Sequence, residues 1–226
     1  MAGGARNEVW LVRGATGLFV AKSTRRCEEA VAWVAEIQAL LRGAGHVVPR
    51  YVQTQDKTFT SSGLTLEPYV DGRGGNDADK AGLTALLSDL HRLTRGFRQR
   101  PGFASAQDLR SHPIGGDIDL TAMPGDLVAM CRSHWAKIPE IPPCAIHGDP
   151  GLGNVLVTPR GQVVLIDWDE ARLDWPGFDL AALNPAAPGQ TALLAWEVAC
   201  CWQAEPDYAH ALARKLRPPC DPPAPI

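Results

Sequence analysis

The sequence lacks several features that would place it in other classes of protein. It has no apolar run near the roughly 18 residues that a membrane span requires, and its first residues contain no apolar core of a secretory signal. Its formal net charge of only -3 argues against a general nucleic-acid binder. We therefore expect a cytoplasmic protein that binds neither membranes nor nucleic acids.

The cysteines are scattered, and their spacing fits neither zinc binding nor a disulfide framework. The six cysteines (positions 27, 131, 144, 200, 201 and 220) include no C-x-x-C pair of the kind that binds zinc. A chain of 226 residues buries enough apolar surface to fold without disulfides. We expect reduced, mostly buried thiols in a globular protein that is a monomer or a homodimer.

The chain does contain a motif that is typical of phosphoryl transfer. The octet His147-Gly148-Asp149-Pro150-Gly151-Leu152-Gly153-Asn154 has H-x-D-x-x-x-x-N spacing, and an apolar run after it ends at Asp167. In such segments the first aspartate accepts the proton of the attacking hydroxyl, while the asparagine and a later aspartate hold magnesium on the nucleotide phosphates. We assign the catalytic base to Asp149, the metal ligands to Asn154 and Asp167, and the bracing of this catalytic loop to His147.

Two apolar runs around a Pro-Gly turn separate Asn154 from Asp167 and predict a β-hairpin. If Thr158 faces Val163, the antiparallel register sets Asn154 opposite Asp167, with Cβ atoms about 4.5 to 5.5 Å apart. Magnesium keeps waters and bridges substrate phosphates, so two protein oxygens suffice. The alternative is a hairpin with polar ends and glycines that only make turns, but three such residues at these offsets form a more specific signal.

The N-terminal part predicts the phosphate side of a nucleotide site. Residues 8–21 have the pattern of two strands joined by a turn, and Lys22 follows the second strand. A helix is expected over 28–42, with Glu36 in its middle. Lys22 would bind the phosphates and Glu36 would hold it by an ion pair, with Glu29 as the rival partner. A surface lysine and a solvated glutamate are the alternative.

The sequence divides at a glycine-rich stretch, 71–75, which suits a hinge. We expect an N-terminal nucleotide-binding lobe over 1–70, with a first strand that is short or absent. A C-terminal catalytic and substrate-binding lobe follows over 71–217. Residues 218–226 are rich in proline, which precludes a helix and predicts a tail.

Apolar periodicity predicts four helices in the second lobe, over 77–94, 126–137, 191–202 and 206–216. The segment 97–124 contains glycine, proline and short polar clusters without a clear period. Such composition is typical of a long surface excursion.

Together these motifs resemble the aminoglycoside phosphotransferase family, within the wider protein-kinase-like fold. The resemblance covers most of the chain and also rests on Ala35-Glu36 leading to Val48-Pro49, on Leu90-His91-Arg92-Leu93 and on Asp179-Leu180-Ala181. It implies an α+β, bilobal fold, with a small β-sheet lobe that contains one helix and a larger, mainly helical lobe. It also implies ATP or GTP with Mg²⁺ as cofactors and phosphorylation of a small-molecule hydroxyl.

The resemblance assigns further roles by position. It implies that Asp179 anchors the catalytic loop and that the segment 66–70 is the linker between the lobes. Backbone groups near Glu67 and Tyr69 would then meet the adenine, since Pro68 has no N–H to donate. The resemblance implies the same phosphate-binding, catalytic and metal-binding roles that are given above to Lys22 with Glu36, to Asp149, and to Asn154 with Asp167.

The glycine-rich phosphate loop of the family corresponds here to Gly3, Gly4 and the residues up to Asn7. The strand that usually precedes that loop is short or absent in this sequence. Backbone N–H groups of these residues would still cover phosphates. The alternative is a disordered start of the chain.

Acidic residues are concentrated downstream of the motif. Once Asp167 and Asp179 are set aside, the segment 167–207 retains one basic residue, Arg172, and six acidic residues: Asp169, Glu170, Asp174, Glu197, Glu205 and Asp207. At roughly 4 Å and an effective dielectric near 20, one charge pair contributes about 4 kcal/mol before desolvation. Such a wall would select a cationic substrate, although a solvated acidic helix face has the same composition.

We therefore predict a kinase for a cationic antibiotic, such as an aminoglycoside or a basic peptide antibiotic, with a role in resistance or self-protection. One alternative is a metabolic kinase for choline, homoserine or a sugar. Another is a nucleotide-binding pseudokinase, which the short N-terminus favours and the intact Asp149, Asn154 and Asp167 oppose.

Overall fold

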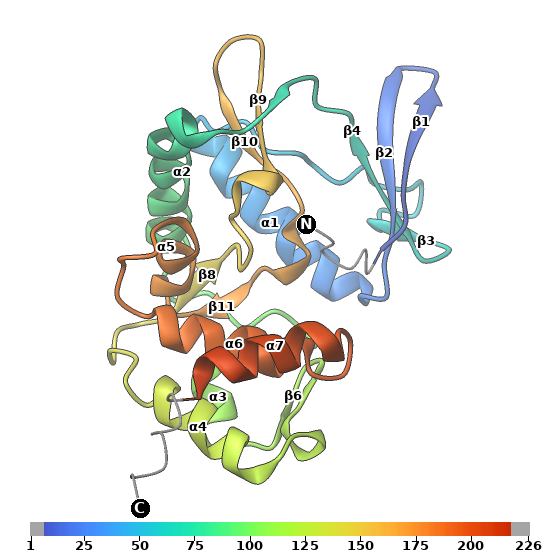
Figure 1. Cartoon of the computed structure of the whole chain (residues 1–226). Coiled ribbons are helices and arrows are strands. Elements are labelled where there is room, and N and C mark those ends of the chain that lie inside the picture. The colour runs from blue at the N-terminus through green and yellow to red at the C-terminus, as the bar shows by residue number, and fades with distance from the viewer. Residues whose placement is uncertain (1–6, 218–226) are drawn as a thin grey trace, which may run out of the picture.

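The computed structural model describes residues 7–217 of the chain, which begin with a small antiparallel sheet (Figure 1). The sheet has the order β1-β2-β4-β3, with β1 Val9–Gly14, β2 Gly17–Ser23, β3 Thr60–Ser61 and β4 Leu64–Pro68. β1 and β2 form the expected hairpin, and its turn holds Gly17 at a φ of 141°. Glycine adopts such a φ without the steric penalty of a Cβ, so the chain can reverse there.

Helix α1, Glu28–Gly43, packs against α2, Lys80–Leu93, and joins the sheet to the rest of the molecule (Figure 1). The apolar spacing that predicted α1 is its buried face, which includes Val34, Ile37 and Leu41. Full burial of one such side chain contributes about 1.5 to 3 kcal/mol. The face of leucines on α2 completes this core.

Short strands carry the loops that hold the catalytic motif. β8, Cys144–Ile146, pairs antiparallel with β11, Arg172–Asp174, and β9, Val155–Val157, pairs with β10, Val163–Leu165. β5, Arg73–Gly74, lies on the other edge of β9. Residues from β8, β9 and β10 belong to the same core as α1 and α2, so the loops leave a packed support.

Further helices contribute to a second core, which extends below these strands (Figure 1). They are α4 Gly125–Trp135, α5 Gly177–Leu183, α6 Gln190–Cys201 and α7 Pro206–Leu216. Single-turn 3₁₀ helices accompany them: η1 Asp77–Asp79, η2 Leu120–Ala122, η3 Leu152–Asn154 and η4 Trp168–Glu170. The sequence predicted α4, α6 and α7, whereas α5 has seven residues and is too short to show a helical period.

The segment 97–124 is not the surface excursion that we expected. It forms α3 Ala106–Leu109, β6 Ile114–Gly115 and β7 Ile118–Asp119. Leu109, Ile118 and Leu120 are at most 5% exposed and belong to the second core. Elements of two to four residues produce no measurable period, so their apolar side chains gave no signal in the sequence.

No helix within residues 7–217 is long and apolar enough to cross a membrane. The predicted tail, 218–226, lies outside the described residues.

Candidate active site

Asp149 stands exposed on a loop that leaves buried strand β8. The loop turns at Gly148, which has a φ of 86°. A Cβ at Gly148 would lie 2.5 Å from the carbonyl oxygen of Glu170. Both this clash and the positive φ therefore exclude a side chain at this position. The close approach fixes the backbone immediately before Asp149 against the segment after β10.

Asp179, on α5, anchors this loop from below. Its carboxylate accepts hydrogen bonds from the backbone N–H of His147 at 3.0 Å and of Gly148 at 2.9 Å, and it lies 2.9 Å from Nε2 of His91. Burial by itself would raise the pKa of Asp179, but the hydrogen bond and charge of His91 outweigh it and lower the pKa. A buried carboxylate with three donors makes a rigid support for the loop.

His147 is fully buried and braces the loop, as expected. Its Nε2 lies 3.0 Å from the carbonyl oxygen of Ile166, and its Nδ1 lies 3.3 Å from the backbone nitrogen of Asp149. The two contacts suit one neutral tautomer, with the proton on Nε2. Burial also lowers the pKa of His147. His147 thus links the catalytic loop to the strand that ends before Asp167.

The hairpin that joins Asn154 to Asp167 forms, but our expected register is wrong by one residue. Val157 faces Val163, and the backbone N–H of Ile166 donates to the carbonyl oxygen of Asn154 at 2.9 Å. Asn154 is therefore opposite Ile166, and Asp167 lies one residue beyond. Asp167 has left-handed backbone angles, φ 62° and ψ 69°, which are uncommon for a residue with a side chain.

The side chain of Asn154 is oriented by Asp149. Its Nδ2 donates to the carbonyl oxygen and to Oδ2 of Asp149, both at 2.9 Å. Since the amide nitrogen is engaged, Oδ1 remains for a cation. Within residues 7–217 no group of three or more His, Cys, Asp or Glu side chains is placed to hold a metal alone. A metal held by the expected ligands Asn154 and Asp167 would need further ligands, such as water or substrate phosphates.

Lys22, at the end of β2, reaches the metal-ligand segment directly. Its Nζ lies 2.5 Å from Oδ1 of Asp167 and 3.0 Å from Oδ2 of Asp169. Burial by itself would lower the pKa of Lys22, but the charges of Asp169 and Asp167 outweigh it and raise the pKa. The ammonium is therefore a fixed positive charge beside the expected metal ligand.

The expected ion pair between Lys22 and Glu36 is not formed. Glu36 is exposed on α1 and pairs with Arg98 at 3.5 Å. Glu29, the rival partner, is exposed in the first turn of the same helix. Helical rotation decides this outcome, because the face of α1 that turns inward carries Val34 and Ile37.

A cavity of about 270 Å³ lies between the N-terminal sheet and the hairpin β9–β10. Its polar end contains Lys22, Asp167 and Asp169. Its apolar walls include Val9, Val20, Pro49, Leu156 and Ile166, and its edge is Pro68-Tyr69-Val70. Apolar walls with a few charged side chains are typical of small-molecule sites.

The backbone of β4 refines the expected contacts at Glu67 and Tyr69. Tyr69 donates its N–H to the carbonyl oxygen of Leu18 at 2.9 Å, and Glu67 faces Val20 in the same antiparallel register. Alternate residues in a strand turn their backbone groups to opposite edges. The carbonyl of Pro68 and the N–H of Val70 are therefore expected to point away from β2.

Glu67 contributes its side chain to the same cavity. Burial, with smaller contributions from the charges of Asp169 and Asp167, raises its pKa to about 7, despite the opposing charge of Lys22. A carboxyl group that titrates near neutral pH is unusual and is common at functional sites. Gly3 and Gly4, the expected phosphate loop, lie outside the described residues.

Comparison with known proteins identifies the family. A sequence model of the phosphotransferase enzyme family matches residues 1–197 of the chain. The chain belongs to the phosphotransferase enzyme family. It is accordingly a phosphotransferase. A comparison with curated protein sequences finds no match.

Solved structures similar to this phosphotransferase show its fold. Choline kinase LicA from Streptococcus pneumoniae aligns with a TM-score of 0.62 at 14% identity, over 95% of this chain and 90% of that one. Macrolide 2'-phosphotransferase MphH from Brachybacterium faecium has a TM-score of 0.60 at 17% identity, over 98% of this chain and 92% of that one. Spectinomycin phosphotransferase APH(9)-Ia, in complex with ADP and spectinomycin, has a TM-score of 0.61 at 13% identity, over 96% of this chain and 84% of that one. The expected α+β, protein-kinase-like fold is confirmed.

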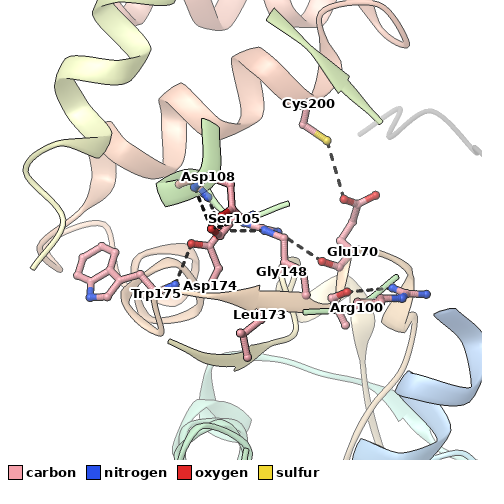
Figure 2. Close-up of polar contacts among 12 residues, drawn as sticks. Arg100, Ser105, Asp108, Gly148, Glu170, Leu173, Asp174, Trp175 and Cys200 are labelled. Atoms are coloured by element: carbon pink, nitrogen blue, oxygen red, sulfur yellow. Dashed lines mark hydrogen bonds and ion pairs between the residues drawn. The ribbon is translucent and has the colours of Figure 1, made fainter. Parts of the chain in front are cut away.

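Two of the six acidic residues that we expected to line the substrate site of the phosphotransferase lie elsewhere. Asp174 is buried and pairs with Arg172 at 2.9 Å, while also accepting from the N–H groups of Ala106 and Trp175 (Figure 2). Its role is structural, since it joins α3 to β11. Asp169 faces Lys22 in the nucleotide cavity rather than the acceptor side.

The other four lie on α6 or at the start of α7, or point toward α6. Glu170 points toward α6, where the thiol of Cys200 lies 3.9 Å from its carboxylate (Figure 2). Glu197, on α6, is 3.5 Å from the hydroxyl of Tyr208, and its pKa is raised by burial and further by the charge of Asp149. Glu205 and Asp207 stand at the start of α7, next in the chain. The structure therefore leaves four of the six acidic residues as candidates for a substrate site.

Proposed function

We propose that this enzyme transfers the γ-phosphoryl group of ATP or GTP, with Mg²⁺, to a hydroxyl group of a small cationic molecule. One observation carries the proposal. Asp149 is exposed at a loop that Asp179 and His147 fix from below, and Asn154 joins it at 2.9 Å to the hairpin that ends at Asp167. A proton acceptor is thus held beside a phosphate and metal site.

In this mechanism Asp149 accepts the proton of the substrate hydroxyl as the oxygen attacks phosphorus. The buried contacts of Asp179 and His147 hold the backbone that carries Asp149, and Asn154 orients its carboxylate, which lowers the entropy cost of the attack. Lys22 places a positive charge at the phosphate end of the cavity. Bound Mg²⁺ supplies charge neutralisation on the phosphates, and Asn154 Oδ1 with Asp167 would hold it.

The purine would lie between the sheet and Leu156, with the Pro68 carbonyl and the Val70 N–H at its edge. The carbonyl can accept from an amino group and the N–H can donate to a ring nitrogen, a pair that adenine matches. The carboxyl group of Glu67 lies in the same cavity. These groups favour ATP, with GTP as the alternative.

The proposed cationic substrate rests on the carboxylates near Asp149. Burial is the main cause that raises the pKa of Glu197, and the charge of Asp149 adds to it. Glu170 approaches the same helix from the turn after Asp167. An ammonium group on the substrate would relieve the repulsion among these carboxylates. Aminoglycosides and basic peptide antibiotics have such groups, as does choline among the metabolites.

A screen with radiolabelled ATP and GTP tests this function. The acceptors are aminoglycosides, basic peptide antibiotics, choline, homoserine and neutral sugars, each with wild type and Asp149→Ala. We expect transfer to a cationic acceptor that Asp149→Ala abolishes. Transfer to neutral acceptors alone would contradict the cationic substrate, and equal counts for wild type and Asp149→Ala throughout would favour a nucleotide-binding pseudokinase.

A further inference from the structure

Helix α1 supplies no carboxylate to Lys22, although it contains three glutamates. Glu28 is committed to the loop before β3, where it accepts from the N–H groups of Phe59 at 2.7 Å and Thr60 at 3.0 Å. Glu36 pairs with Arg98, and Glu29 is exposed at the start of the helix. The inward face of α1 is apolar except for Gln38. The lysine of the phosphate site must therefore be positioned by another element.

Asp169 makes the contact with Lys22 that no glutamate of α1 makes. Its Oδ2 lies 3.0 Å from Nζ of Lys22 and also accepts a hydrogen bond from the side-chain amide of Asn7. The left-handed backbone at Asp167 turns the chain into η4, so that Asp167 and Asp169 both reach the same ammonium. Asp169 thus connects the residue before β1, the lysine of β2 and the metal-ligand segment.

The backbone under Asp169 is held by a buried arginine from the segment that sequence reasoning placed at the surface. Arg100 is 2% exposed and donates to the carbonyl oxygens of Asp169 at 2.8 Å, Ala171 at 2.9 Å and Trp168 at 3.2 Å. Its Nε donates to Ala30 of α1 at 3.0 Å. Four carbonyl contacts from one side chain fix the turn on which Asp169 stands.

We infer that Asp169 positions Lys22 in the nucleotide-bound enzyme, in the place that we had expected a glutamate of α1 to fill. The inference rests on the proposed function. Mg²⁺ would draw the carboxylate of Asp167 toward the metal, whereas Asp169 keeps its contacts with Lys22 and Asn7. One turn of the chain then carries both the metal ligand and the anchor of the lysine.

A double-mutant cycle on nucleotide binding tests whether Asp169 acts through Lys22. Binding of MgADP and MgGDP is measured by calorimetry for wild type, Asp169→Asn, Lys22→Met and the double variant. We expect Asp169→Asn to weaken binding of the preferred nucleotide roughly tenfold, the loss of one charge-assisted contact. In the Lys22→Met background, Asp169→Asn should change the nucleotide affinity less than about twofold, because the effects of substitutions at two coupled residues do not add.

Three further variants make the cycle specific. Asp169→Glu should recover part of the affinity, since it restores the charge. Asp126→Asn is the matched control, because it removes an exposed carboxylate that pairs with Arg217. Glu36→Gln tests the helix directly. If Asp169→Asn proves unstable in thermal unfolding, Asp169→Ser replaces it in the cycle.

The outcomes separate the inference from the function on which it rests. If Asp169→Asn weakens nucleotide binding as much in the Lys22→Met background as in the wild type, the inference is overturned. It is also overturned if Asp169→Asn binds nucleotide normally while Glu36→Gln binds it more weakly. Either result leaves the proposed function intact. A wild type that binds neither MgADP nor MgGDP overturns both.

Discussion

The catalytic loop and the lysine site differ in where their contacts come from. Asp149 and Asn154 are joined within five residues of one chain segment, and His147 braces the same segment. Lys22 instead meets Asp167 across 145 residues of sequence. A short segment with fixed spacing specifies its own geometry, whereas a contact between distant elements depends on how each element is rotated. The comparison explains why the sequence predicted the loop from His147 to Asn154 and missed the partner of the lysine.

The largest expected effect is on the reaction rate, when Asp149, the proposed base of the catalytic loop, is replaced. Asp149→Asn keeps the shape of the side chain and removes its ability to accept the proton. We expect kcat to fall by about 10² to 10⁴-fold, with unchanged thermal unfolding because Asp149 is exposed. Steady-state kinetics with the acceptor from the screen measures it. A variant of normal rate would show that the loop positions some other base.

The next effect tests how the loop is supported. Asp179→Asn leaves the N–H groups of His147 and Gly148 facing an amide, and we expect about 3 kcal/mol of destabilisation in urea unfolding. The pKa of Asp179 is lowered in the folded state, so its stabilisation is present above the ordinary value of 3.8 and is lost as the pH falls through the lower folded pKa. The wild type should therefore lose its advantage over the variant in acid. An equal difference at pH 7 and pH 2 would contradict this sign.

A smaller effect, of opposite sign, is expected in the nucleotide cavity. The pKa of Glu67 is raised from 4.5 to about 7, so folding binds a proton between these values and stability falls as the pH rises through that window. Glu67→Gln removes this penalty and should stabilise the apo protein by about 1 to 3 kcal/mol at pH 8, but little at pH 4. Urea unfolding at the two pH values measures the difference, and a variant less stable than wild type at pH 8 would count against it.

The smallest effect belongs to the residue that sequence reasoning chose as the lysine partner. Glu36→Gln breaks only an exposed pair with Arg98, so we expect the unfolding free energy to change by less than about 0.5 kcal/mol. Chemical denaturation measures it, with Asp126→Asn as the matched surface control. A change above 1 kcal/mol would mean that Glu36 makes contacts beyond Arg98.

Much of the fold followed from patterns that need only neighbours in sequence. The helices α1, α2, α4, α6 and α7 were predicted from apolar periods, and the β1–β2 and β9–β10 hairpins from strand and turn patterns. The register of the second hairpin was wrong by one residue because the turn takes one more residue than we assumed. The short elements between α2 and α4 carried no period, so the burial of Leu109 and Arg100 was not predictable.

The sequence by itself determined the catalytic motif, since the spacing from His147 to Asn154 and on to Asp167 lies within one loop and one hairpin. Only the tertiary structure decided which acidic residues share a site. Asp169, Glu170 and Asp174 are neighbours in sequence, yet they face Lys22, α6 and a buried arginine respectively. The physical reason is that one turn of backbone sends successive side chains in different directions, and packing alone sets what each of them meets.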